Sequence, residues 1–249
     1  MPKYSLLFIV ALTGVAAAFA EPEKSSFKID TGFVFARGSY GLATDTDVFL
    51  ALVNPTYETA AWRVEGSLPY VRLKGPATVV GNTGNASAMH SASGVGDAAL
   101  GLTRKFAAST DGWSSSLGAK VKFPTADEQK GLGTGKMDTT VQIDVFKAGG
   151  TVTPFANIGY QFLGHSEAYP MKSGPLATVG MTTKISSNVI GLAGNWRARM
   201  IEGSDHALEA MAFLQHPFNE KSRIQLFVLH GFTDASPNLA AGLMLGFTF

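Results

Sequence analysis

The chain has 249 residues, a formal net charge of +1, 16% charged residues, 45% hydrophobic residues and no cysteine. The lack of cysteine excludes disulfides and thiolate metal sites, and the near-neutral charge excludes the basic footprint of a nucleic-acid-binding protein. The charged fraction is low against the roughly 25% of ordinary soluble domains.

The first predicted element is a secretory signal peptide. Lys3 supplies a positive start, residues 6–18 form an apolar stretch, and Ala18-Phe19-Ala20 is a small-residue cleavage pattern before Glu21. This layout is typical of a cleaved export signal. The alternative, a permanent helical anchor, needs about 20 apolar residues. We therefore expect residues 1–20 to be removed and residues 21–249 to form one domain.

The rest of the chain predicts twelve β-strands. Past residue 20 no long apolar run occurs, and apolar residues recur at every second position, the period of a strand with one apolar face. Each strand exceeds the roughly 9–11 tilted residues that cross a membrane, and the number is even, as in single-chain bacterial barrels. The expected strands are 26–38, 46–58, 61–74, 94–107, 113–125, 137–148, 151–164, 175–186, 188–201, 206–218, 222–234 and 238–249.

The expected connections differ in length between the two ends. The even-numbered ones are short, whereas the long segments 75–93, 126–136 and 165–174 all follow odd-numbered strands, although some odd connections are short as well. Outer-membrane barrels have short periplasmic turns and longer extracellular loops. The fold class is therefore expected to be all-β, an antiparallel up-and-down transmembrane β-barrel of about 12 strands.

The last expected strand, NLAAGLMLGFTF, ends the chain on Phe249, with Phe247 two residues before it. This ending resembles the assembly signal of bacterial outer-membrane barrels. A soluble protein seldom leaves such a strand as a bare edge. We expect Phe247 and Phe249 to be the assembly signal, with the barrel-assembly machinery and outer-membrane lipids as partners.

Charged side chains share one face of most expected strands. Lys120 and Lys122, for example, alternate with Ala119, Val121 and Phe123. A basic side chain facing lipid at midplane costs about 2–4 kcal/mol, so the charged face is predicted to line the lumen. The predicted lumen residues are Arg63, Glu65, Asp97, Lys105, Lys120, Lys122, Asp144, Lys184, Arg197, Arg199, Glu209 and Arg223.

Two interpretations of these lumen charges remain open. They either line a water-filled path that selects by charge, or they form a salt-bridged plug in a barrel narrower than the 16–18-stranded porins. If the lumen conducts, the excess of basic residues in this set predicts a modest anion preference.

The sequence contains no convincing catalytic or metal motif. The tract Gly131-Leu-Gly-Thr-Gly-Lys136 lacks the Ser or Thr that a phosphate-binding loop places after its Lys, and a strand follows instead of a helix. The histidines are not in metal-ligand spacing, and no G-x-S-x-G occurs. No enzyme activity, cofactor or metal is expected. The five histidines are His90, His165, His206, His216 and His230.

A series of short motifs within residues 61–164 resembles a known family. It comprises Leu68-Pro-Tyr70, Ser93-Gly-Val-Gly-Asp97, Gly118-Ala-Lys-Val-Lys-Phe-Pro-Thr125, Gly131-Leu-Gly-Thr-Gly-Lys-Met-Asp138 and Asn157-Ile-Gly-Tyr160. The series resembles the outer-membrane proteins of the MetA pathway of phenol degradation, often called transporters. The resemblance implies an outer-membrane barrel that imports small organic molecules such as aromatics.

These observations together predict a porin-like barrel in the outer membrane of a Gram-negative bacterium that allows passive passage of small solutes. Two alternatives stay open. One is a closed structural or adhesive barrel that binds partners through its extracellular loops. The other is a membrane-embedded lipid hydrolase.

Overall fold

The computed structural model describes residues 25–77, 90–165 and 170–249. The expected signal peptide and most of the long segment 75–93 lie outside these residues. The strands are β1 (Ser26–Gly38), β2 (Thr46–Glu58), β3 (Trp62–Gly75), β4 (His90–Val95), β5 (Ala99–Lys105), β6 (Trp113–Lys122), β7 (Asp138–Lys147), β8 (Val152–Phe162), β9 (Gly174–Ile185), β10 (Asn188–Arg197), β11 (Ala207–Asn219), β12 (Ser222–Gly231) and β13 (Leu239–Thr248).

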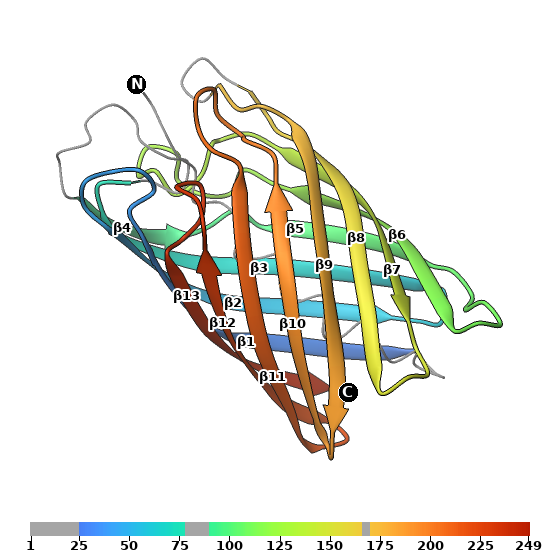
Figure 1. Ribbon diagram of the computed structural model, residues 1–249. Coiled ribbons are helices and arrows are strands. Elements are labelled where there is room, and N and C mark those ends of the chain that lie inside the picture. Colours follow the sequence, from blue (N-terminus) through green and yellow to red (C-terminus); the bar gives the residue numbers. More distant parts are fainter. Residues whose placement is uncertain (1–24, 78–89, 166–169) are drawn as a thin grey trace.

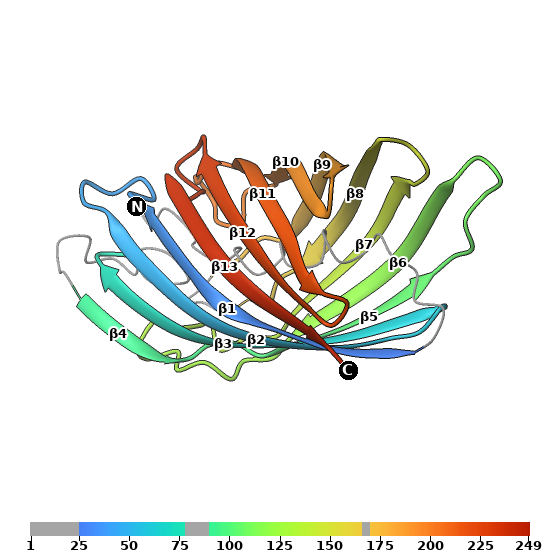
Figure 2. The same cartoon turned by 90° about the horizontal axis from the view of Figure 1, so that it is seen from below.

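The strands form one antiparallel sheet that closes on itself (Figures 1 and 2). Strands adjacent in the wall are adjacent in the chain except that β3 pairs with both β4 and β5, and β13 closes the wall by pairing with β1 from Leu239↔Arg37 to Thr248↔Lys28. Closure removes the exposed edges that an open sheet would leave. The expected up-and-down barrel is confirmed.

Two strands, β4 and β5, take the place of the expected strand 94–107, and β4 begins at His90, inside the expected connection 75–93. β4 pairs with residues 70–75 of β3 and β5 pairs with residues 62–67, so the two strands share one position in a wall of twelve positions. Asp97 lies at the break, where its carboxylate accepts hydrogen bonds from Lys122 Nζ and from the Ala126 amide. The backbone at the break also bonds outside the ladder, because the Thr125 hydroxyl donates to the Gly96 carbonyl and accepts from the Ala98 amide.

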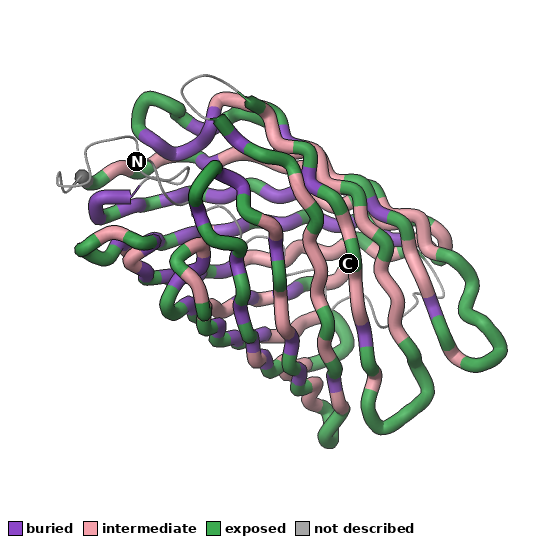
Figure 3. Tube along the Cα trace, turned by 45° about the horizontal axis from the view of Figure 1, so that its top comes forward, coloured by how far each residue is buried: buried purple, intermediate pink, exposed green. Residues whose placement is uncertain are grey.

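Apolar side chains cover the outside of the wall. On β12, Leu226 and Val228 are 43% and 54% exposed, whereas Phe227 and Leu229, which alternate with them, are 5% and 2% exposed. Figure 3 shows the same alternation of buried and exposed residues along β1, β2, β3, β11 and β12, whereas β5 to β9 carry mostly intermediate and exposed residues. Soluble monomers rarely expose continuous apolar patches beyond a few hundred Å². The outer surface is therefore suited to lipid.

Aromatic rings and cations meet on the outer surface at the end of the wall that carries the short hairpins. The Arg104 guanidinium lies 5.0 Å from the centroid of the Trp62 ring, and Lys147 Nζ lies 5.6 Å from that of Trp113. Membrane barrels carry aromatic girdles where the wall meets the membrane–water interface. Within the described ranges, no helix is long and apolar enough to cross a membrane.

Part of the segment 126–136 folds into the barrel, although the sequence suggested an extracellular loop there, whereas residues 127–130 are exposed. Leu132 is 1% exposed and belongs to the same buried cluster as Val71 and Leu73 of β3. Its Cδ1 atom would lie 3.0 Å from a Cβ added to Gly94 of β4. This inward-folded loop narrows the end of the lumen opposite the short hairpins.

Candidate functional site

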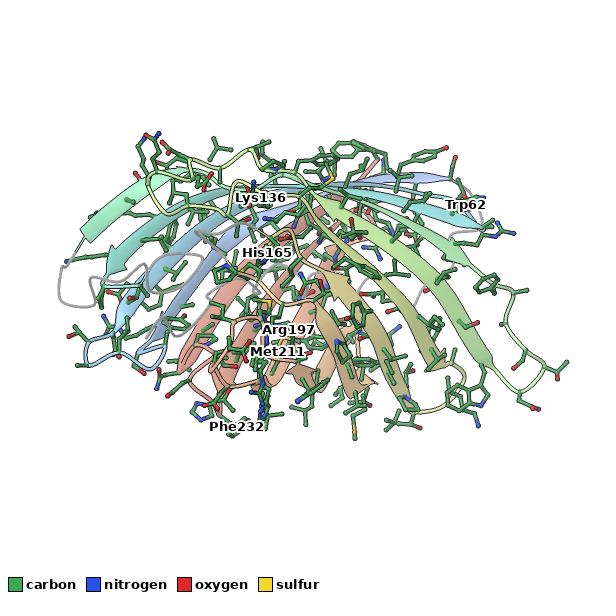
Figure 4. All side chains as sticks on the ribbon, turned by 90° about the horizontal axis from the view of Figure 1, so that it is seen from above. Trp62, Lys136, His165, Arg197, Met211 and Phe232 are labelled. Carbon is green, nitrogen blue, oxygen red and sulfur yellow. The ribbon has the colours of Figure 1, made fainter. Side chains whose placement is uncertain are left out.

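The interior of the wall, the lumen, is the candidate site, and the strand register orders the side chains that line it. Hydrogen-bonded partners on neighbouring strands lie directly opposite one another, and every second residue faces the same side. Following partner to partner therefore traces a row of inward side chains round the wall. Figure 4 shows Arg197 and Met211 inside the barrel, while Trp62 and Phe232 point away from it.

Three successive rows are polar and form what we call the polar stripe. The first joins β5 to β11 through Lys105, Ser116, Asp144, Asn157, Thr178, Asn195 and Glu209. The second joins β2 to β11 through Glu58, Arg63, Thr103, Gly118, Gln142, Gly159, Leu176, Arg197 and Ala207. The third joins β1 to β8 through Lys28, Thr56, Glu65, Gly101, Lys120, Thr140 and Gln161.

Two further rows are almost wholly apolar and form the apolar stripe. One joins β7 to β4 through Phe146, Phe155, Gly180, Ala193, Met211, Leu229, Ala240, Ala36, Val48, Leu73 and Ala92. The other joins β10 to β4 through Gly191, Phe213, Phe227, Gly242, Val34, Leu50, Val71 and Gly94. Most of these residues form one buried cluster.

Both stripes climb along the lumen because rows run across tilted strands. The longer apolar row takes ten steps between strands of about 4.8 Å, and at a tilt of about 40° it rises roughly 30 Å, the thickness of a bilayer's hydrocarbon core. Its two ends agree with this estimate. Phe146 lies beside the short turn after β7, whereas Leu73 lies near the opposite end of the wall. Polar and apolar surfaces thus run side by side from one mouth to the other.

Ion pairs join strands at the end of the lumen that lies near the carboxyl terminus. Glu58, almost fully buried, accepts from Lys28 Nζ at 2.7 Å and from Lys105 Nζ at 3.1 Å. Arg223 Nη2 lies 2.6 Å from Asp30 Oδ1, and this pair joins β12 to β1 across Gly246 of β13. A Cβ on Gly246 would lie 2.5 Å from that oxygen. The glycine therefore makes room for the ion pair against the wall.

A second ionic cluster fixes the inward-folded loop. Lys122 Nζ lies 2.7 Å from Asp97 Oδ2 and 3.0 Å from Asp138 Oδ2, and all three side chains are more than four-fifths buried. Thr134 of the loop lies 3.3 Å from the same ammonium. The cation thus joins β6, β7 and the β4–β5 break to the loop.

The structure brings most of the predicted lumen residues to the inner face. Arg63 Nη2 lies 3.1 Å from Glu65 Oε2, Asp144 accepts from Ser116 Oγ and Gln142 Nε2, and Lys120 lies in the polar stripe. Lys184 is inward by register but exposed at the end of β9. Arg197 and Glu209 are each 9% exposed.

Arg199 is a correction. It was expected to share the inner face with Arg197, but β10 ends at Arg197, and Arg199 is exposed beyond that end. Polar and apolar residues still alternate in the sequence after Arg197, but the chain leaves the sheet there, so the pattern no longer reports which side faces the lumen. The expected proximity of Arg197 and Arg199 on one strand face is therefore wrong.

Four inward charges escaped the sequence analysis: Lys28, Asp30, Glu58 and Asp138. The alternation of Lys28 and Asp30 with Phe27 and Ile29 was a usable signal. With them, the described lumen carries the cations Lys28, Arg63, Lys105, Lys120, Lys122, Lys184, Arg197 and Arg223 against the anions Asp30, Glu58, Glu65, Asp97, Asp138, Asp144 and Glu209. Eight cations against seven anions remove the reason to expect anion preference.

Several buried amides in the lumen have no hydrogen-bond partner within the part of the chain that the structure describes. Asn54 is 7% exposed with neither side-chain atom bonded, and Gln161, 3% exposed, has an unbonded Oε1. Gln215 Oε1, in the row next to Phe213, is also unbonded. A buried polar atom normally has a partner, so these amides mark positions where an ordered water would complete the hydrogen bonding of the wall.

The described histidines do not form a catalytic or metal constellation. His216 Nδ1 lies 2.7 Å from Asn188 Oδ1 on the outer face, and no hydrogen bond joins a described histidine to a serine. No group of three metal-binding side chains occurs in the same residues. Outside the wall, burial raises the pKa of the Tyr40 phenol, and a hydrogen bond from Lys130 lowers the pKa of the Asp127 carboxyl.

A closed wall with an apolar exterior and an amphipathic interior defines the class of transmembrane β-barrels. The chain belongs to the family described as "Putative MetA-pathway of phenol degradation", whose model matches residues 28–249. The resemblance seen in residues 61–164 is thereby confirmed and extended to the end of the chain. No curated protein sequence matches the chain.

Solved outer-membrane barrels share the fold at low sequence identity. The COG4313 outer membrane channel from Pseudomonas putida F1 superimposes with a TM-score of 0.70 at 16% identity, over 94% of this chain and 98% of the channel. The KdgM porin gives 0.55 at 8% identity, over 89% and 99%. The β-domain of the Bordetella autotransporter BrkA gives 0.52 at 10% identity, over 91% and 100%.

Proposed function

We propose that the protein is a passive channel for small organic solutes, aromatic ones included, in the outer membrane of a Gram-negative bacterium. The observation that carries this proposal is the pairing of an apolar with a polar stripe along the lumen. A molecule with a ring and a polar group meets a matching surface for each part at every depth, so neither part has to be fully desolvated without compensation.

Other features support a channel for organic molecules over an ion-selective pore. The lumen charges nearly cancel and are largely paired with one another, which weakens selection by charge. The family description refers to phenol degradation, and two of the similar structures are named as a channel and a porin.

Liposome swelling tests the proposal. Zwitterionic amino acids are suitable probes because their charges keep them from crossing the lipid itself. We expect phenylalanine to enter vesicles containing the protein faster than glutamine, although glutamine is the smaller solute. Equal rates, or rates ordered by size alone, would reject a ring-selective lumen. If none of the solutes causes swelling and the protein conducts no ions, the closed structural barrel would be supported.

A further inference from the structure

Four residues of the apolar stripe form a symmetrical row across β10–β13. Gly191, Phe213, Phe227 and Gly242 are consecutive register partners, with the two phenylalanines directly opposite each other in the middle. Both rings are buried. We call this set the Gly-Phe-Phe-Gly row. Its three steps between strands span roughly 14 Å of the inner wall.

Each ring lies over the glycine that flanks it in the row: Phe213 over Gly191 and Phe227 over Gly242. A Cβ added to Gly191 would stand 2.2 Å from Cζ and 2.3 Å from Cε1 of Phe213. A Cβ added to Gly242 would stand 2.3 Å from Cε1 and 2.5 Å from Cζ of Phe227. Real Cβ atoms do not approach carbon so closely, so these ring positions exist only because the neighbour lacks a side chain.

A third pair repeats the arrangement in the neighbouring row. Phe155 of β8 is the register partner of Gly180 of β9, and a Cβ on Gly180 would stand 2.3 Å from Phe155 Cζ. Three of the phenylalanines on the inner wall thus lie against a glycine of the adjacent strand. Such a ring covers the wall and does not project toward the barrel axis.

We propose that these glycines set the width of the apolar path, because they let the Phe213 and Phe227 rings pack back against the wall, and that the position of these two rings controls the passage of ring-bearing solutes. This inference rests on the proposed channel function and names the residues that control it. With glycine at 191 and 242, the rings lie against the neighbouring strands and are almost fully buried. With any larger residue there, the rings must turn inward and narrow the path.

Gly191→Ala is the cleanest test, because all three atoms nearest to its added Cβ belong to the Phe213 ring. Gly194→Ala is the control on the outer face of the same strand, since the nearest atom to its Cβ is the Glu209 carbonyl oxygen at 4.0 Å. We expect Gly191→Ala to slow phenylalanine entry into liposomes several-fold and glycine entry much less, whereas Gly194→Ala changes neither. The double variant Gly191→Ala/Phe213→Ala should recover the phenylalanine rate.

A second readout reports the ring itself. With 4-fluorophenylalanine incorporated at position 213 alone, the ¹⁹F chemical shift should change in Gly191→Ala and stay unchanged in Gly194→Ala. If Gly191→Ala does not assemble, the same comparison applies to Gly242→Ala with and without Phe227→Ala.

The outcomes separate the two proposals. A wild-type protein that passes no solute overturns the channel function and this inference with it. A wild-type protein that passes phenylalanine, with an unchanged rate in Gly191→Ala, overturns only the inference, whether or not the ¹⁹F signal moves. A slowed rate that removal of the Phe213 ring does not restore also overturns it.

Discussion

Single residues control the ion selectivity of the lumen, and Glu58 is the clearest case. Its side chain is 3% exposed and stands between two ammonium groups. Glu58→Gln should leave Lys28 and Lys105 without their counter-charge, and the low-dielectric wall focuses the resulting field. We expect reversal potentials under a salt gradient to shift toward anion preference, and the shift to shrink at 1 M salt, where the screening length is about 3 Å.

The wild-type protein is the reference for that measurement. Because its described lumen charges nearly cancel, its own reversal potential should lie close to zero. A strong anion preference in the wild type would contradict the charge balance. It would instead support the excess of basic lumen residues that the sequence suggested.

Lys122 is the residue on which the inward-folded loop depends. Lys122→Met removes a cation between two buried carboxylates, and breaking a buried pair from one side costs about 3–5 kcal/mol. We expect the free energy of unfolding in lipid vesicles to fall by about 3 kcal/mol and proteases to cut within residues 126–136.

The control lies in the same loop. Lys130 pairs with Asp127, but the side chains are 59% and 42% exposed, so Lys130→Met should leave the free energy of unfolding nearly unchanged. Equal effects of the two substitutions would show that Lys122 does not hold the loop.

At the scale of elements, β13 closes the wall and ends the chain. The Phe249 amide donates to the Phe27 carbonyl at 2.8 Å, and the two rings lie 6.0 Å apart on the outer surface. Deleting Phe249 should lower the yield of heat-modifiable barrel in isolated outer membranes without changing secretion. Phe249→Tyr, which keeps a ring, should assemble normally. A deletion that assembles as well as wild type would remove the basis for an assembly signal at this terminus.

The elements themselves were largely predictable, since a period of two is a local property of the sequence. Most observed strand ends lie within three residues of the expected ones, whereas β10 ends four residues earlier than expected and β4 begins four residues before the expected strand 94–107. The break between β4 and β5 was not predictable. At the break, the Gly96 carbonyl and the Ala98 amide bond to the Thr125 hydroxyl. Thr125 follows the next strand in the chain, so no local pattern indicates this contact.

At the scale of the whole molecule, we predict that the amino-terminal signal peptide is cleaved, which the fold does not test. The mature protein should begin at Glu21, because a small-residue pattern follows the apolar stretch. Intact-mass measurement of protein extracted from outer membranes gives the answer. A mass that includes residues 1–20 would mean that the segment remains as an anchor.

The sequence by itself determined the barrel class, the order of its strands and the inner face of the charged ones. These follow from alternation and from the cost of charge in lipid, and both are read strand by strand. On strands with apolar residues on both faces, such as β2 from Val48 to Val53, alternation gave no indication of which residues face inward.

Only the tertiary structure decided how inward residues join from strand to strand. Register and tilt place Phe213 opposite Phe227, carry Phe146 and Leu73 into one climbing row, and bring Lys28 and Lys105 to the same carboxylate. They also set a glycine beside each ring. These neighbours are far apart in the sequence, and their contact depends on closure of the whole wall. The amphipathic lumen is therefore a property of the closed barrel, which no single strand carries.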